Sequence, residues 1–175
     1  VLAVNTLLMQ LFTLFSYVMD GFAYAGEALA GRYIGAGNQP ALRNTVNRLF
    51  YWGIGLSAAF TLLYATGGKI FLGLLTDNLS VINASDTYFY WALAIPLAGF
   101  SAFLWDGIFI GATATRPMLY SMLAASASFF IVYSLFHDFL GNHALWLAFL
   151  VYLSLRGIIQ TLIGRKIIKK TIPRR

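Results

Sequence analysis

The chain of 175 residues is 59% hydrophobic and only 10% charged, with a formal net charge of +6 and a mean hydropathy of +0.74. Soluble domains hold a near-even mix of apolar and polar residues, so this composition excludes a soluble enzyme and predicts an all-α integral membrane protein. The absence of cysteine excludes disulfides, thiol catalysis and Cys-ligated metal sites.

The apolar residues form blocks of about 20 residues, the length needed to cross about 30 Å of hydrocarbon. We expect a first span at about residues 7–36, ending in the glycine-rich segment 35–37. Asn38 and Pro40 suit the cap and first turn of the next helix, with a second span at about 46–67. Residues 70–75 are expected to lie along the interface, and the polar segment 76–86 to form a loop.

A third span is expected at about 87–111, with a kink at Pro96, because proline removes a backbone donor. Pro117 opens a fourth span at about 117–136, and Gly141 with Asn142 separates it from a fifth at about 143–164. Residues 165–175 form a basic tail. Five spans leave the two ends on opposite sides of the bilayer and the chain starts at Val1, so we expect part of a longer transporter.

Basic residues are concentrated on one side of the expected membrane. When the loops alternate across the bilayer, only Lys69 falls on the side of Asp77, Asp86 and Asp138. The opposite side holds Arg32, Arg43, Arg48, Arg116, Arg165, Lys166, Lys169, Lys170, Arg174 and Arg175. The positive-inside rule therefore predicts a cytoplasmic carboxy terminus, whose positive charge meets anionic lipid headgroups rather than nucleic acid.

Four ionisable side chains lie within the expected spans: Asp20, Glu27, Asp106 and Arg156. Such groups are costly in hydrocarbon, so each is a candidate for transport or ion coupling. At about 1.5 Å per residue, counting from the cytoplasmic helix ends gives depths of roughly 13, 9 and 12 Å for Glu27, Asp106 and Arg156, and roughly 24 Å for Asp20. The first three could therefore meet, whereas Asp20 has no evident basic partner.

These depths give the four residues different expected roles. A carboxyl group in a poorly hydrated cavity retains its proton more readily, whereas a nearby guanidinium favours the ionised form. We therefore expect Asp20 to be the better proton carrier, and Glu27 with Asp106 and Arg156 to form a structural ion pair or a gate. The simpler alternative is that all four make satisfied contacts between helices.

Other residues indicate packing rather than chemistry. Gly31 with Gly35, and Gly107 with Gly111, recur at a spacing of four and favour close helix packing. His137 and His143 make a poor metal site, because no acidic residues cluster around them. The chain contains no nucleotide-binding, zinc-protease or nucleophile-elbow motif, so we expect neither a cofactor nor a metal.

Several strings resemble the MATE multidrug efflux family, in its branch named for DNA-damage-inducible protein F. The segments 2–9 and 19–25, followed by Glu27 and the glycines of 31–37, resemble the eighth helix of that branch. Residues 105–113 with Met118 resemble the tenth helix, and residues 140–148 and 153–157 resemble the twelfth.

The resemblance implies a twelve-helix transporter with two six-helix lobes, of which this chain would supply helices eight to twelve of the second lobe. It implies secondary active efflux of an organic, often cationic, compound across a bacterial inner membrane, in exchange for protons or sodium. Asp106 lies about one turn from the carboxylate of the family's sodium site, so protons are favoured. The partners implied are the amino-terminal lobe of the same protein, the substrate and membrane lipids.

Two other functions stay open at this stage. A lipid-linked-sugar flippase of the same superfamily would be favoured by a cavity lined with basic residues. A membrane subunit or scaffold that does not transport would need nothing beyond the five spans.

Overall fold

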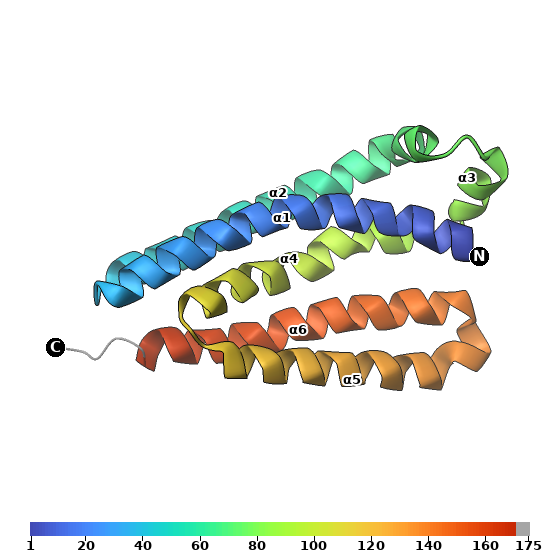
Figure 1. Cartoon of the computed structure of the whole chain (residues 1–175). Coiled ribbons are helices and arrows are strands. Elements are labelled where there is room, and N and C mark those ends of the chain that lie inside the picture. The colour runs from blue at the N-terminus through green and yellow to red at the C-terminus, as the bar shows by residue number, and fades with distance from the viewer. Residues whose placement is uncertain (171–175) are drawn as a thin grey trace.

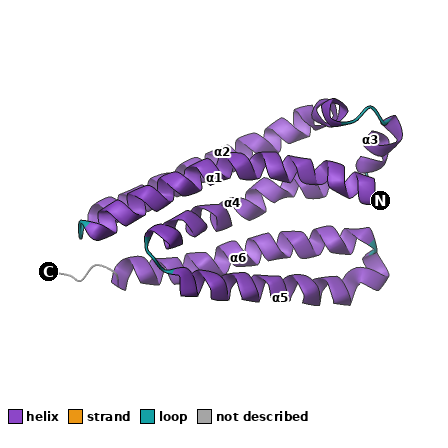
Figure 2. Ribbon diagram, in the orientation of Figure 1, coloured by secondary structure: helices purple, strands orange, loops and turns teal. Residues whose placement is uncertain are grey.

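The computed structural model describes residues 1–170, and every helical segment expected from the sequence is present in it. The helices are α1 (Leu2–Gly35), α2 (Gln39–Leu75), α3 (Leu79–Ser85), α4 (Phe89–Gly111), α5 (Thr115–Leu140) and α6 (Asn142–Lys170). All except α3 are long and apolar enough to cross a bilayer. The described residues contain helices and short turns only (Figure 2), so the chain is an all-α, multi-pass membrane protein.

Three boundaries differ from those expected. Residues 70–75 belong to the same continuous helix as residues 46–67, since no proline follows Pro40 in α2 and the glycine pair at 67 and 68 does not end the helix. The expected loop at 76–86 contains the short helix α3, whose Asn78 side chain accepts hydrogen bonds from the Ser80 and Val81 amides. The expected tail is helical from 165 to 170, whereas Arg174 and Arg175 lie outside the described residues.

The turns between helices form where small and capping residues interrupt the apolar blocks. Asn38 accepts a hydrogen bond from the Ala41 amide at 3.1 Å and so caps α2, and Pro40 lies in its first turn. Gly37 and Gly141 take positive φ values of 63° and 52°, which glycine adopts without steric cost. Both turns match the expectation from sequence.

Helix α4 lies at the centre of the bundle (Figure 1). The hairpin of α1 and α2 packs on one side of it and the hairpin of α5 and α6 on the other. Pro96 lies inside α4, as expected. A proline ring disturbs the hydrogen bonds of the preceding turn, and the Thr61 hydroxyl of α2 donates to one carbonyl of that turn, Leu93, at 3.2 Å.

Glycines bring α1 and α4 into backbone contact. A Cβ atom added to Gly107 would overlap the Ala23 carbonyl oxygen, and one added to Gly111 would overlap the carbonyl oxygen of Glu27. A Cβ added to Gly31 would lie 3.3 Å from the Gly111 oxygen, whereas nothing lies within 4 Å of one added to Gly35. The expected packing role is therefore confirmed for Gly31, Gly107 and Gly111, and is wrong for Gly35.

At the end of the bundle near α3, polar side chains join α1 to α6. Asn5 and Asn142 exchange two amide hydrogen bonds of 2.7 and 2.9 Å, and the Trp146 indole donates to Asn5 at 3.0 Å.

The large apolar side chains that remain exposed lie mainly on α2 and α5, as in Trp52 (63%) and Phe130 (66%). Apolar surfaces of this kind are suited to lipid or to further helices.

Candidate functional site

The four ionisable residues expected within the spans do not all meet. Arg156 of α6 donates from Nη2 to Asp106 Oδ2 of α4, and the two form an ion pair. Their side chains are 13% and 19% exposed. The structure thus brings together two of the three residues expected at one depth.

The ion pair belongs to a larger polar network that we call the α4–α6 network, made of Asp106, Tyr152, Arg156 and Gln160. The Gln160 amide donates to the second carboxylate oxygen of Asp106 at 2.7 Å, and Arg156 Nη1 contacts the Tyr152 hydroxyl at 3.4 Å. Two buried atoms, Arg156 Nε and Gln160 Oε1, have no hydrogen-bond partner in the described part of the chain. Buried polar atoms normally have a partner, so each of these two would gain from a bound water or ion.

Of the two acidic side chains of α1, Asp20 is the one whose charge reaches the α4–α6 network, although it makes no hydrogen bond to it. The charge of Asp20 acts on the carboxyl group of Asp106, and Asp20 is partly buried. The Glu27 side chain forms no ion pair or hydrogen bond with the side chains described for residues 1–168. The expected pairing of Asp106 with Arg156 is therefore present, whereas the expected participation of Glu27 is not found among the described side chains.

The local packing explains this difference. Because Gly107 lies against Ala23, the neighbouring Asp106 is carried close to the turn of α1 that contains Asp20. Glu27 lies seven residues, or about two turns, beyond Asp20, and its own backbone carbonyl packs on Gly111. The close crossing of α1 and α4 therefore decides which acidic residue meets the α4–α6 network.

Tyr152 and Gln160 were not among the expected site residues. They lie four residues before and after Arg156, and such a spacing places all three side chains on one face of a helix. A polar stripe along an otherwise apolar span was therefore present in the sequence as a signal. It indicates a helix face turned away from lipid.

No group of three or more His, Asp or Glu side chains that could hold a metal ion occurs in residues 1–170. His143 instead accepts a hydrogen bond from the Trp91 indole at 3.0 Å and lies beside the rings of Tyr88 and Tyr90. His137 contacts the neighbouring Asp138. These contacts lie at the helix ends, where the sequence places both histidines.

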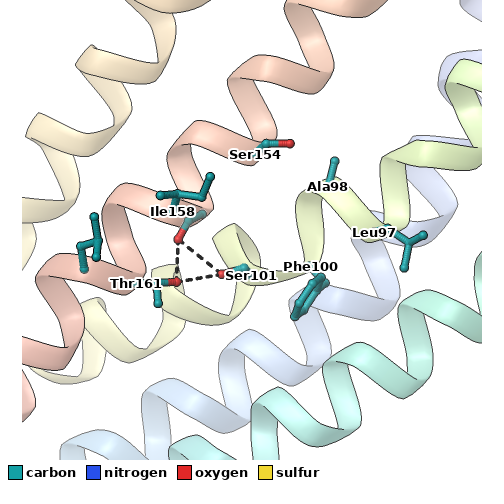
Figure 3. A pocket seen from close by; sticks show the side chains of 9 residues that line it. Leu97, Ala98, Phe100, Ser101, Ser154, Ile158 and Thr161 are labelled. Carbon is teal, nitrogen blue, oxygen red and sulfur yellow. Dashed lines mark hydrogen bonds between the residues drawn. The ribbon is translucent and has the colours of Figure 1, made fainter.

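A small pocket of about 360 Å³ lies between α4 and α6 (Figure 3). Two of its hydroxyls are mutually satisfied, because Ser101 and Thr161 contact each other at 3.2 Å and both reach the Gly157 carbonyl (Figure 3). The remaining lining is largely apolar, including Leu97, Phe100 and Ile158. This pocket therefore offers van der Waals contact rather than charge.

A larger groove of about 1250 Å³ is formed by α2, α4 and α6. Arg43 of α2 and Arg165 of α6 line it near one end, and Phe50 and Trp105 line it farther in. We call it the α2–α6 groove. Its lining contains basic residues but no acidic ones.

The chain was compared with known proteins. A family model described as MatE matches residues 1–136. The chain is 37% identical over 166 residues to DNA damage-inducible protein F of Escherichia coli (strain K12), an alignment that covers 95% of this chain and 36% of that relative. The chain thus spans little more than a third of the length of the curated relative that it matches. No solved structure matches it.

Proposed function

We propose, from the premise that this chain belongs to the MATE (MatE) family, that it forms part of a secondary active exporter. The intact protein would exchange protons for an organic cation across a bacterial inner membrane. The observation that carries the proposal is the Asp106–Arg156 ion pair within the helical bundle, with the charge of Asp20 on α1 near enough to act on Asp106.

The charge of this cluster supports exchange of cations. Arg156 compensates one of the two carboxylates, so one negative charge remains when all three groups are ionised. Uncompensated charge is costly within a membrane, and either a proton or a cationic substrate would neutralise it. A site that takes one positive charge at a time gives competition between the two, which is the requirement for antiport.

The α4–α6 network would transmit this event to the helices. Asp106, Arg156 and Gln160 join α4 to α6, whereas Asp20 lies on α1. Protonation of Asp20 changes the electrostatic interaction between α1 and that network, and a ligand that favours one arrangement shifts the population towards it. Release of substrate would follow from this shift between cavity orientations.

The test is uptake of a fluorescent cationic dye into inverted vesicles that contain the full-length protein and carry an imposed proton gradient. Asp20→Asn is expected to reduce uptake by about tenfold or more, within the range of a coupling free energy of about 1–3 kcal/mol. Glu27→Gln is the matched control, because it removes a carboxylate from the same helix that contacts no charged side chain described for residues 1–168. It is expected to retain uptake near the native level.

Three outcomes would contradict parts of this proposal. Equal uptake by native protein and Asp20→Asn, at equal abundance and folding, would make Asp20 structural. Loss of uptake in Glu27→Gln but not in Asp20→Asn would show that Glu27, and not Asp20, carries the coupling. Absence of uptake by the native protein would favour a scaffold without transport.

A lipid-linked-sugar flippase is the second candidate, and the α2–α6 groove is the observation that favours it. Arg43 and Arg165 in that groove are suited to a phosphate group. The acidic cluster around Asp20 is suited to a cation instead. Dye uptake by the native protein would favour the exporter, whereas gradient-independent transfer of a lipid-linked sugar between leaflets would favour the flippase.

We also infer that the basic end of the bundle faces the cytoplasm. The α1–α2 turn, the α4–α5 turn and the end of α6 share one end of the bundle, while α3 lies at the other (Figure 1).

Because the 175 residues contain no cysteine, single introduced cysteines can report the orientation of the bundle in the membrane. In a full-length background without other cysteines, Ala36→Cys is expected to react with a membrane-impermeant maleimide in inverted vesicles, and Ala84→Cys in spheroplasts. The reverse pattern would overturn the inferred orientation.

A further inference from the structure

The α2–α6 groove has properties that the exporter proposal does not use. One wall comes from α2, where Gln39, Arg43, Phe50 and Ile54 recur at helical spacing along one face. The other wall comes from α6, through Thr161, Arg165 and Ile168, and Trp105 of α4 also lines the groove. The two walls touch little, and the Gln39 amide reaches the Ile168 carbonyl at 3.3 Å across the groove.

The polar end of the groove carries unpaired positive charge. Arg43 and Arg165 are exposed and form no salt bridge within residues 1–170. The amide side chains of Asn44 and Asn47 line the groove beside them. With no carboxylate in the lining, this end is suited to an anion that accepts several hydrogen bonds, such as a phosphate group.

The rest of the groove is apolar and runs into the depth of the bilayer. Along α2, Ile54 lies eleven residues beyond Arg43, which is about 16 Å of helix and close to half of the roughly 30 Å hydrocarbon thickness. Val46, Phe50 and Ile54 follow in that order along this wall. The groove therefore combines a basic entrance at the interface with an apolar channel one leaflet deep.

We propose that the α2–α6 groove is a binding site for an anionic phospholipid. The headgroup phosphate would lie between Arg43 and Arg165, and one acyl chain would lie along Phe50 and Ile54 towards the membrane centre. Basic pockets between membrane helices bind anionic headgroups in this way. A free phosphate ion would satisfy the two arginines, but it would leave the apolar length of the groove unused.

Native mass spectrometry of the full-length protein tests this site. After delipidation, the protein is titrated with phosphatidylglycerol, and in parallel with phosphatidylcholine and inorganic phosphate. Native protein is expected to retain phosphatidylglycerol over both alternatives. Arg43→Gln with Arg165→Gln is expected to weaken retention by about 25-fold, or about fivefold for each arginine removed near the membrane surface. Arg116→Gln is the matched control, because Arg116 is an exposed arginine at the same end of the bundle outside the groove.

A second variant tests the apolar part without changing charge. Ile54 is 53% exposed, so Ile54→Trp narrows the groove without disturbing the core. This variant is expected to weaken retention of long-chain phosphatidylglycerol more than retention of a short-chain analogue. Unchanged retention in the double arginine variant, with normal circular dichroism and monodispersity, would overturn the proposal. Retention of inorganic phosphate as strong as that of phosphatidylglycerol would also overturn it, since the site would then be a phosphate site rather than a lipid site.

Discussion

Arg156→Met alone is expected to destabilise the protein by about 3–5 kcal/mol, because it leaves the Asp106 carboxylate within the bundle without its ionic partner. Gln160 would still donate one hydrogen bond to Asp106, but an amide supplies no compensating charge. The double variant Asp106→Asn/Arg156→Met removes both charges, keeps an acceptor for Gln160, and is expected to recover most of the loss. Most of the stability lost when Arg156 is removed is therefore the cost of an unpaired Asp106 carboxylate, and not the net attraction of the ion pair.

The measurement is a double-mutant cycle on the full-length protein, using the apparent unfolding midpoint in detergent and the yield of monodisperse protein. Arg48→Met is a suitable control, since Arg48 is exposed and forms no salt bridge within residues 1–170. Additive effects of the two single variants would show that Asp106 and Arg156 are energetically independent, and would remove the α4–α6 network from the proposed mechanism.

Gly107→Ala is expected to destabilise the protein by about 3 kcal/mol or more, although it adds a single methyl group. Its Cβ atom would overlap the backbone of Ala23, which cannot move aside as a side-chain end could. Separation of α1 from α4 is then the remaining way to relieve the overlap, and overpacking of this kind typically costs about 1–3 kcal/mol even where neighbours yield. The same separation would move Asp20 away from Asp106.

Gly55→Ala is the matched control, because Gly55 lies within α2 and nothing lies within 4 Å of an added Cβ atom. Alanine is favoured over glycine in a helix by about 0.5–1 kcal/mol, so this variant is expected to be neutral or slightly stabilising. The same glycine-to-alanine substitution is therefore expected to lower the stability at position 107 and to leave it unchanged or raise it at position 55. Equal unfolding midpoints for the two variants would contradict the close contact between α1 and α4.

The sequence predicted the class of the protein and the number of its spans, because twenty apolar residues in a row have few alternatives to crossing a bilayer. Local chemistry also predicted the α1–α2 turn, since Asn38 caps a helix and Gly37 takes a positive φ. The helices extend farther than the expected spans, through residues 70–75 in α2 and 165–170 in α6, because apolar and basic residues are both compatible with a continuing helix. Hydropathy measures the membrane-crossing part of a helix and not its full length.

Within the site, counting residues along each helix brought Asp106 and Arg156 to a similar depth, and the structure pairs them. The same counting grouped Glu27 with them and set Asp20 apart, and here the structure differs. Depth along a helix says nothing about which face of it turns towards a neighbour. That choice depends on the crossing of α1 over α4.

The sequence by itself thus determined that this chain lies in a membrane, which blocks of residues form its membrane-crossing helices, and which side chains are too polar for lipid. Each of these follows from the properties of residues close together in the chain. The tertiary structure decided that Asp20 acts on Asp106, that Gln160 joins the ion pair, and that Arg43 and Arg165 line one groove. Those groupings depend on how distant helices pack, as between α1 and α4 at Gly107 and Gly111, where the absence of a side chain sets how closely two backbones approach.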